Sequence, residues 1–281
     1  MNPSRLYGLI GYPVKHSLSP AMHNAAFKAL GINAEYKLFE VVPSELEYFL
    51  ERSKSTISGF NVTIPYKEAI LDFVELDEKS FYLRQVRAVN TIVHKNGVWK
   101  GFNTDIPGFQ RHLKEQCNPV NKRVALLGAG GGAKAVSYVL AKSFAKEITI
   151  FDIDNSKAEG LVAMIKSLFG QCNIYNVDGV KQLDISNKDL LINATPIGLK
   201  DTDPCLVTEE MLHRNLFVYD LIYNPPETKL LSIAKRKGAK VSNGLGMLLY
   251  QGARSFYLWT KKPAPLEIMK QSLNQAVKDL C

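Results

Sequence analysis

The chain has 281 residues, of which 46% are hydrophobic and 22% are charged. A chain of this size can bury a full core, and its length favours one large domain or two of ordinary size. The formal net charge is +8, but Lys and Arg are scattered apart from short clusters such as residues 235–240. A solvated face explains this pattern more simply than a nucleic-acid surface, although a basic protein also suits a small anionic substrate.

Cysteine usage and hydropathy indicate the compartment. The four cysteines lie far apart, without a CxxC or Cys/His spacing: Cys117, Cys172, Cys205 and Cys281. We therefore expect reduced thiols and no metal. The N-terminal residues contain no apolar stretch of signal-peptide length, and no run of about 18 apolar residues occurs. These features predict a cytoplasmic protein with no membrane partner.

The first half of the chain alternates strand-like and helical patterns. The expected elements are strands over 5–11, 34–41 and 59–65, a helix over 19–30, and a hairpin over 88–104. The helix is predicted to begin with Ser19 as N-cap and Pro20 in its first turn, and to end at Gly31. The hairpin is predicted to turn at Asn96-Gly97.

The second half opens near residue 120 and repeats a strand–helix alternation. The expected strands cover 123–130, 147–154, 189–196, 216–223 and 239–244, and helices cover 131–144, 155–168, 246–260 and 264–280. This alternation predicts an α/β protein with a parallel, doubly wound sheet. We expect the last two helices to pack against the first half.

A glycine-rich loop follows the first strand of the second half. Gly128, Gly130 and Ala133 fill the pattern G-x-G-x-x-G/A, and Ala129, Gly131 and Gly132 complete the loop. The first glycine permits a tight turn, the second lets the backbone approach a pyrophosphate, and the third position lets helix and strand pack closely. The free N–H groups of the helix would then face the phosphates. The loop therefore predicts dinucleotide binding, and a tight turn without ligand is the alternative.

Polar residues gather at loops of the first half. Ser17 and Ser19 precede a helix, where hydroxyls and free N–H groups can hold a carboxylate. Lys67 lies in a loop that leaves the preceding strand at a proline. Asn90 and Asp105 lie at the ends of strands, where ligands of α/β proteins bind. Each has a plainer interpretation alone: a helix cap, a solvated lysine or a turn residue.

Taken together, the motifs resemble the shikimate dehydrogenase family. The resemblance runs through GYPVKHSLSPAMHN, GFNVTIPYK, AVNT, GFNTDIPGF, GAGGGAKA, NATPIGL, DLIYNPPETKLL and NGLGMLLYQG, in the family's order and spacing. It implies two α/β domains with a cleft between them: a substrate-binding domain over 1–105, completed by C-terminal helices over 250–281, and a Rossmann-like doubly wound nucleotide-binding domain over 106–249. A monomer or homodimer is expected. Arg87 departs from the family, which usually has glycine before AVNT.

The resemblance also implies the role of each site residue. Three hydroxyl groups would hold the substrate carboxylate: those of Ser17, Ser19 and Tyr223. The ring hydroxyls would contact Thr63, Asn90, Asp105 and Gln251. Lys67 and Asp105 would form the catalytic pair, with Lys67 moving the proton at the reacting hydroxyl. The nicotinamide cofactor would lie beside Thr195, Pro196, Gly244 and Met247. We expect structural roles for His16 and His23.

The implied activity is the reversible conversion of shikimate to 3-dehydroshikimate with NAD or NADP, in the pathway to chorismate and aromatic amino acids. An enzyme that prefers quinate is the nearest alternative, but relatives favouring quinate often carry threonine where this chain has Ser19. A catalytically silent metabolite-binding protein would be expected to have lost Lys67 or Asp105. A nucleic-acid-binding protein is the remaining alternative.

The end of the strand after the glycine loop bears on the choice of cofactor. Family members that use NADP usually have an Asn-Arg-Thr run there, and this chain has Asp152, Ile153 and Asp154. An acidic side chain about 20 residues beyond the loop accepts hydrogen bonds from the ribose 2′-OH of NAD. Lys157 is the nearest cation in the sequence, and it replaces an arginine fork poorly. We therefore predict a preference for NAD, unless Asp152 or Asp154 only caps the following helix.

Overall fold

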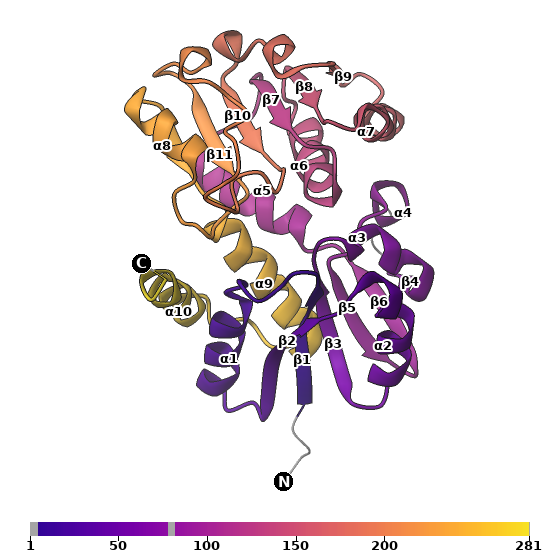
Figure 1. Ribbon diagram of the computed structural model, residues 1–281. Helices are drawn as coiled ribbons and strands as arrows, with labels where there is room; N and C mark the ends of the chain where they lie inside the picture. Colours follow the sequence, from indigo (N-terminus) through magenta and orange to yellow (C-terminus); the bar gives the residue numbers. More distant parts are fainter. Residues whose placement is uncertain (1–4, 78–81, 281) are drawn as a thin grey trace. The chain divides into compact units, whose positions relative to one another are not determined.

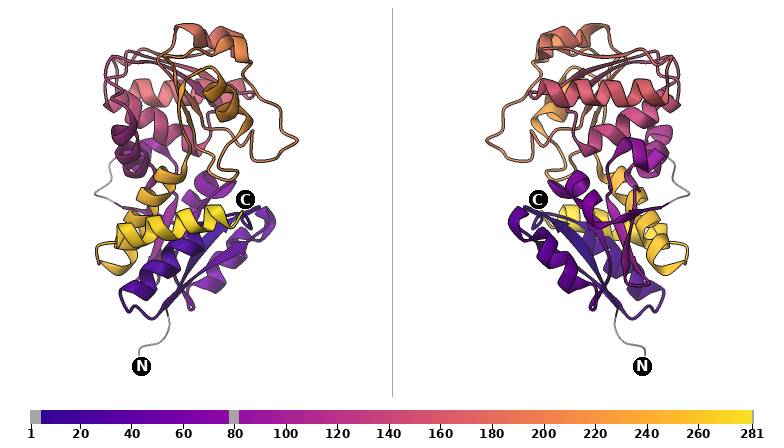
Figure 2. Two further views of the ribbon diagram at one scale, coloured as in Figure 1. Left: turned by 90° about the vertical axis from the view of Figure 1, so that its left-hand side faces the viewer. Right: turned by 90° about the vertical axis from the view of Figure 1, so that its right-hand side faces the viewer.

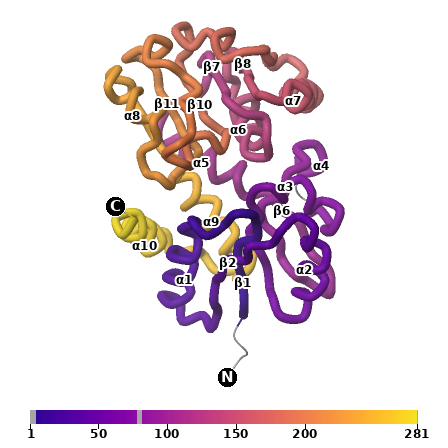
Figure 3. Tube along the Cα trace, viewed as in Figure 1, coloured from indigo at the N-terminus to yellow at the C-terminus, as the bar shows by residue number. Residues whose placement is uncertain are grey.

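The computed structural model describes residues 5–77 and 82–280 (Figure 1). The chain divides into two compact units, Met1–Gly108 with Leu248–Cys281, and Phe109–Met247. In Figure 3 the trace begins in the first unit in indigo, passes through the second unit in magenta and orange, and returns to the first unit in yellow. The first unit is therefore built from two segments of chain that lie far apart in the sequence.

The first unit is built on a mixed six-stranded sheet. Its strands are β1 (Arg5–Gly11), β2 (Ala34–Glu40), β3 (Ile57–Val62), β4 (Glu75–Leu76), β5 (Thr91–Lys95) and β6 (Val98–Phe102), in the order β2-β1-β3-β5-β6-β4. β1 pairs in parallel with β2 and β3, whereas β5 runs antiparallel to both β3 and β6. The hairpin turns at Asn96 and Gly97, both with positive φ, as predicted.

Helices cover both faces of this sheet. The first unit contains α1 (Ser19–Ala29), α2 (Leu46–Ser53), α3 (Tyr66–Ala69), α4 (Tyr82–Val86), most of α9 (Leu245–Thr260) and α10 (Leu266–Lys278). On one face, Phe60 of β3 packs in an apolar cluster with Leu46 and Leu50 of α2. On the other face, Trp259 of α9 stacks on Tyr7 of β1. The views in Figure 2 show yellow α10 running beside indigo α1, with which it is in contact, so the chain's end packs on its beginning, as expected.

The start of α1 differs from the prediction. Leu18, not Ser19, is the N-cap residue, and no side chain caps the helix from that position. Ser19 is already helical, and its own N–H donates to the Oγ of Ser17 at 3.3 Å. The prediction was wrong because the first helical turn closes one residue earlier, with the Ala21 N–H donating to the Leu18 carbonyl. Gly31, with φ +58°, follows the end of the helix as predicted.

The second unit is a fully parallel six-stranded sheet. Its strands are β7 (Arg123–Leu127), β8 (Glu147–Phe151), β9 (Ile174–Asn176), β10 (Leu190–Asn193), β11 (Phe217–Asp220) and β12 (Lys240–Ser242), in the order β12-β11-β10-β7-β8-β9. This is the strand order of a doubly wound dinucleotide-binding domain, in which the order of strand addition reverses between β7 and β10 while all strands stay parallel. The doubly wound sheet predicted from the sequence is confirmed.

Four helices belong wholly or largely to the second unit: α5 (Asp105–Gln116, from Phe109 onward), α6 (Gly131–Lys142), α7 (Asn155–Leu168) and α8 (Lys229–Arg236). Val218 of β11 packs with Leu230 and Leu231 of α8. The next residue, Tyr219, contacts Phe109 of α5, so α5 lies on the opposite face of the sheet. Within residues 5–77 and 82–280, no helix has the length and apolar character needed to cross a membrane.

Candidate functional site

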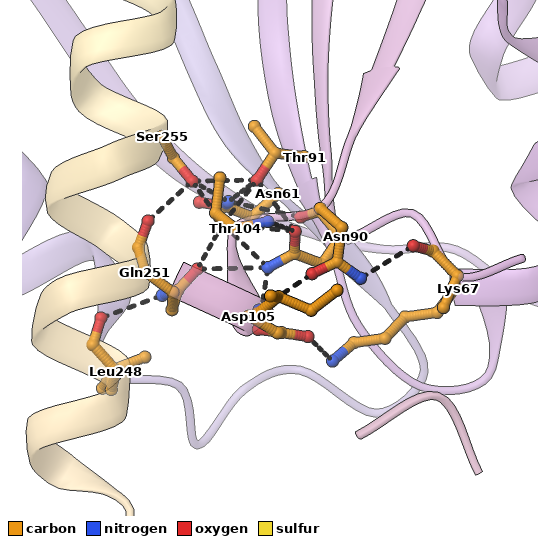
Figure 4. A network of polar contacts seen from close by, with 12 residues as sticks. Asn61, Lys67, Asn90, Thr91, Thr104, Asp105, Leu248, Gln251 and Ser255 are labelled. Carbon is orange, nitrogen blue, oxygen red and sulfur yellow. Dashed lines mark hydrogen bonds and ion pairs between the residues drawn. The ribbon is translucent and has the colours of Figure 1, made fainter. Parts of the chain in front are cut away.

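The centre of the first unit's polar site is an ion pair between Lys67 and Asp105. Lys67 lies in α3, just after β3, and Asp105 opens α5, just after β6. The lysine Nζ lies 2.5 Å from the Asp105 Oδ2, and the two side chains are 18% and 7% exposed (Figure 4). The carboxylate holds the ammonium in one place, while the lysine keeps a path to solvent. The structure therefore brings together the two residues predicted as the catalytic pair.

Asn90 fixes the other side of the Asp105 carboxylate. Its Nδ2 donates to Asp105 Oδ1 at 2.8 Å, and its Oδ1 accepts the backbone N–H of Thr104 at 2.6 Å. Because a backbone N–H can only donate, this bond decides which end of the amide faces Asp105. Asn90 therefore holds one carboxylate oxygen while Lys67 holds the other.

Gln251 joins the same group from α9. Its Oε1 lies 3.4 Å from both Asn90 Nδ2 and Thr104 Oγ1, and its Nε2 donates to the Leu248 carbonyl at 2.9 Å. The four residues Lys67, Asn90, Asp105 and Gln251 thus form one hydrogen-bonded network, three of them on or beside different strands of one sheet and the fourth on α9 (Figure 4). Such a cluster of donors and acceptors can bind several hydroxyl groups of a small polyol.

The serine pair forms a separate group within the first unit. Ser17 is half-buried and Ser19 is buried, and their hydroxyl oxygens lie 3.2 Å apart. Thr63 lies at the end of β3, where its N–H donates to the Ile10 carbonyl at 3.0 Å. Its side chain packs so closely on Gly11 that a Cβ added there would lie 2.4 Å from the Thr63 methyl group. The role of these three residues toward a substrate stays a prediction.

The glycine loop of the second unit has the backbone geometry that a dinucleotide requires. Gly128 has φ +100°, and a Cβ there would meet Thr195 and the Ala194 backbone at 3.0–3.1 Å. Gly130 is the N-cap of α6, and a Cβ there would meet nothing within 4 Å. No side chain caps α6, so among the described residues no side-chain oxygen competes for its first N–H groups. These residues fit a bound pyrophosphate.

The acidic residues after β8 have two different roles. Asp152 Oδ2 accepts the Ala129 N–H at 2.6 Å, which ties the end of β8 to the glycine loop. Its Oδ1 accepts the Asp154 N–H at 2.9 Å. Asp154 is the N-cap of α7 and accepts the Lys157 N–H, so helix capping accounts for Asp154 and does not account for Asp152. Ile153 between them is 96% exposed.

A buried carboxyl group organises the loops after β10 and β11. Asp220 Oδ1 accepts from the Asn193 side chain at 3.0 Å and from the Ile222 N–H at 3.1 Å, and Oδ2 accepts from Thr228 at 2.7 Å. Burial raises the pKa of Asp220 to about 6. Asn193 Oδ1 in turn accepts the N–H and the hydroxyl of Thr195. This cluster shapes the loop that carries Thr195, at the carboxyl edge where α/β sheets bind ligands.

The other predicted residues of the second unit lie in loops or beside them. Gly244 is buried, and a Cβ there would lie 2.0 Å from the Leu221 carbonyl oxygen. Met247 is buried near the start of α9, Pro196 is exposed in the loop after β10, and half-buried Tyr223 follows β11. Their contacts with a cofactor or substrate stay predictions.

His23 and Arg87 both have structural explanations. His23 is fully buried and stacks on Tyr36 with the ring centroids 4.4 Å apart, and burial lowers its pKa to about 3. A histidine so buried cannot exchange protons with a substrate near neutral pH. Arg87 follows α4 with φ +46° and an exposed side chain. Positive φ explains why glycine suits this position, and the exposed arginine leaves the loop intact.

Four buried residues around Asn90 were missed by sequence reasoning: Asn61, Thr91, Thr104 and Ser255. Thr91 and Thr104 are direct neighbours of predicted site residues in the AVNT and FNTD motifs, which was a usable signal. Asn61 lies in the GFNVTIPYK motif and is an unusual residue for a strand, which was also a signal. Ser255 carries no such signal, because a serine in an apolar helix is an ordinary residue.

Comparisons with known proteins agree with this geometry. Residues 9–92 match the sequence profile of the shikimate dehydrogenase substrate binding domain, and residues 244–273 match the shikimate 5′-dehydrogenase C-terminal domain. A shikimate dehydrogenase (NADP(+)) from Methanopyrus kandleri is 44% identical over 96% of this chain and 95% of its own length. The chain belongs to the shikimate dehydrogenase family. Members of this family are oxidoreductases that use a nicotinamide cofactor, as the motifs predicted.

Solved structures of shikimate dehydrogenases also resemble this chain over nearly its whole length. A shikimate dehydrogenase in complex with NADP+ has a TM-score of 0.87 and 39% identity, covering 98% of this chain and 96% of that one. The enzyme from Listeria monocytogenes, solved with shikimate and NAD, has a TM-score of 0.83 and 36% identity, covering 97% of each chain. The relatives therefore include structures with either cofactor.

Proposed function

We propose that this chain interconverts shikimate and 3-dehydroshikimate with a nicotinamide cofactor. The observation that carries the proposal is the buried Lys67–Asp105 pair, with Asn90 and Gln251 bonded around it. A polyol substrate needs several directed hydrogen bonds, and its oxidation needs a group that moves one proton at the reacting oxygen. This network supplies both.

The protein's part in the reaction is proton transfer and orientation. When bound, the nicotinamide supplies the hydride chemistry. In the reductive direction the Lys67 ammonium donates a proton to the substrate oxygen, and in the oxidative direction the neutral amine accepts the hydroxyl proton. Asp105 keeps the Nζ in place, and Asn90 keeps Asp105 in place, so the reacting groups meet with little loss of orientation entropy.

The proposed substrate contacts follow the same logic. Ser17, Ser19 and Tyr223 would hold the carboxylate through their hydroxyl groups. Thr63, Asn90 and Gln251 would hold ring hydroxyls. Hydroxyl groups can hold a carboxylate by hydrogen bonds alone. They place no second positive charge near the ammonium of Lys67.

The activity is tested by following reduced cofactor by absorbance with shikimate and quinate, each with NAD and with NADP. We expect turnover of shikimate with at least one of the two cofactors, and we expect kcat/KM to be higher for shikimate than for quinate. Activity on neither substrate would overturn the proposal, and stronger activity on quinate would replace it with the alternative substrate.

The serine pair offers a test of substrate choice. Quinate carries an extra hydroxyl on the carbon that bears the carboxylate, so discrimination is expected at Ser19, whose Oγ lies 3.2 Å from that of Ser17. We expect Ser19→Thr to lower kcat/KM for shikimate relative to quinate. An equal loss on both substrates would mean that the pair binds the carboxylate and does not discriminate.

We further propose that NAD is preferred, although the relative from Methanopyrus kandleri carries NADP(+) in its name. Asp152 is held at the glycine loop by the Ala129 N–H, and the exposed neighbour is Ile153, not arginine. A 2′-phosphate there would meet a carboxylate, and close like charges cost several kcal/mol. Lys157 lies 3.3 Å from Asp154, which already engages its charge.

Cofactor preference is tested by the ratio of kcat/KM for NAD and NADP. We expect NAD to be favoured by at least about tenfold, and Asp152→Asn combined with Ile153→Arg to reverse the preference. Asp154→Ser keeps a helix-capping hydroxyl but releases Lys157 from its ion pair, so a shift toward NADP in this variant would measure the part played by Lys157. An unmodified enzyme that works better with NADP would contradict the proposal and would indicate that Lys157 or another cation reaches the phosphate.

A further inference from the structure

Behind Asn90 lies a triangle of buried hydroxyl groups. The Oγ1 atoms of Thr91 and Thr104 lie 3.0 Å apart, and the Oγ of Ser255 lies 2.8 Å and 3.1 Å from them (Figure 4). All three residues are fully buried. The triangle joins the start of β5, the turn between β6 and α5, and the middle of α9. Three elements of the first unit that carry site residues therefore meet at these hydroxyls.

Asn61 of β3 donates two further hydrogen bonds to this triangle. The Tyr36 hydroxyl donates to Asn61 Oδ1 at 2.8 Å, so the Nδ2 of Asn61 faces the triangle. That Nδ2 donates to Ser255 Oγ at 2.9 Å and to Thr91 Oγ1 at 3.0 Å. The Asn61 side chain thus points from β3 toward α9, with all of its polar atoms bonded.

Ser255 has no bonding capacity left over. Its hydroxyl hydrogen donates to the Gln251 carbonyl at 3.0 Å, one turn earlier in α9. Its two lone pairs then accept from Asn61 and from one threonine hydroxyl. A serine that only bonds its own helix needs one partner, whereas Ser255 also anchors α9 to β3 and to the strand that follows Asn90.

A second contact fixes the same turn of α9. A Cβ added at Gly108 would lie 2.7 Å from the Gln251 N atom and 2.8 Å from its Cβ, so α5 and α9 touch at Gln251 without a side chain between them. Gln251 is therefore held between Gly108 on one side and the Ser255 anchor one turn away. The position of α9 along its own axis, relative to the sheet, therefore determines where the Gln251 side chain contacts Asn90.

We propose that Ser255, bonded to Asn61, is a positioning residue that holds Gln251 beside Asn90 for substrate binding. The proposal rests on the proposed function, because it assigns Gln251 and Asn90 to the ring hydroxyls of the substrate. Ser255 touches no substrate in this assignment and acts through the helix register alone. Removing the Ser255 hydroxyl leaves Asn61 Nδ2 with the Thr91 hydroxyl and the Asn90 carbonyl as acceptors, and it breaks the bond that ties α9 to β3.

The test compares Ser255→Ala with the unmodified enzyme under saturating cofactor. The KM for shikimate is expected to rise about three- to tenfold, with kcat within about twofold, because contacts made in both ground state and transition state are weakened. Ser53→Ala is the matched control: it removes another buried serine hydroxyl, which bonds the Phe49 carbonyl of its own helix α2. The control is expected to leave KM unchanged.

A double-mutant cycle separates positioning from general loss of stability. If Ser255 acts through Gln251, then adding Ser255→Ala to Gln251→Ala raises the KM for shikimate by less than twofold further. Independent, multiplied effects of the two substitutions would overturn the proposal, and so would a Ser255→Ala enzyme with an unchanged KM. If the alanine variant fails to show the native circular dichroism spectrum, Ser255→Cys, which keeps a side chain of similar shape and weakens the hydrogen bonds, takes its place in the cycle.

The unmodified enzyme keeps the two proposals apart. Absence of shikimate turnover in the unmodified enzyme overturns the proposed function. Turnover in the unmodified enzyme, together with multiplied effects in the cycle, overturns only the role of Ser255.

Discussion

The site of the first unit and the glycine loop of the second are built in opposite ways. Around Lys67 and Asp105, side chains are held in place by hydrogen bonds to other side chains. At Gly128 and Gly130 the side chains are absent, and the backbone itself is presented. The first kind of site fails when atoms are taken away, whereas the second fails when atoms are added.

The largest effect is expected from Lys67→Ala. Loss of positioned proton transfer should lower kcat by about 10²–10⁴-fold, while the KM for shikimate stays within about tenfold. Steady-state kinetics with purified enzyme measures both. Lys54→Ala, which removes a surface lysine paired with Glu51, is the control and should behave like the unmodified enzyme. A near-normal kcat for the Lys67 variant would place the proton transfer elsewhere.

The next effect is the dependence of folding stability on pH, which is expected to come from the buried His23 beside the side-chain site. Its pKa is lowered to about 3 in the folded chain, whereas an unfolded histidine titrates near 6.5. Between these values only the unfolded chain binds the proton, so stability is lost as the pH falls from about 6.5 toward 3. At about pH 4.5 this loss is about 3 kcal/mol.

The measurement is the free energy of unfolding of the unmodified protein and of His23→Phe, at neutral pH and near pH 4.5. Phenylalanine keeps the stacking on Tyr36 and cannot titrate. The unmodified protein should lose about 3 kcal/mol more than the variant on acidification. Equal losses would show that His23 takes up its proton in the folded state at the same pH as in the unfolded state.

Gly130→Ala adds one methyl group to the backbone site. The φ of −75° and ψ of −172° suit any residue, and nothing lies within 4 Å of the new Cβ, so the fold should tolerate it. The methyl occupies space needed by a pyrophosphate, and the KM for the cofactor should rise about tenfold or more. Gly160→Ala in α7, which also meets nothing within 4 Å, should leave that KM unchanged. A lower or equal cofactor KM in the Gly130 variant would mean that the phosphates bind elsewhere.

The smallest effect is expected from Arg87→Gly. A left-handed conformation costs a non-glycine residue about 1–2 kcal/mol, and glycine loses part of this gain through the greater entropy of the unfolded chain. The melting temperature should rise by about 1–3 °C. Asn96→Gly, at another position with positive φ, should gain less because asparagine tolerates this conformation. A fall in melting temperature would show that the Arg87 side chain contributes more than its backbone costs.

The same contrast explains what could be predicted from the sequence. The glycine loop is local: strand, loop and helix follow one another within about twenty residues, so the sequence alone predicted the turn at Gly128 and the helix that begins after Gly130. The roles of these residues and of Asp152 toward a cofactor stay predictions. Short elements were missed, including β4 with two residues and β9 with three, because so few residues carry no periodicity. The Ser19 cap was wrong because one hydroxyl pattern fits two adjacent starts of a helix.

The side-chain network was only half readable. Lys67, Asn90, Asp105 and Gln251 were found through motifs of a known family. Asn61 and Ser255, which are 194 positions apart in the sequence, meet only because β3 and α9 pack together. No spacing rule links two residues whose proximity is decided by the tertiary fold.

The division of the first unit into two chain segments also orders events during synthesis. The second unit, Phe109–Met247, is continuous, so every strand of its sheet is available once residue 247 has been made. The first unit lacks Leu248–Cys281 at that moment, and with it the anchor at Ser255 and the Trp259 indole that donates to the Ile92 carbonyl. The nucleotide-binding sheet can therefore close on the nascent chain while the substrate half waits for its last helices. Completing the first unit requires contacts between residues at opposite ends of the chain. Contacts of such long sequence separation form slowly during folding.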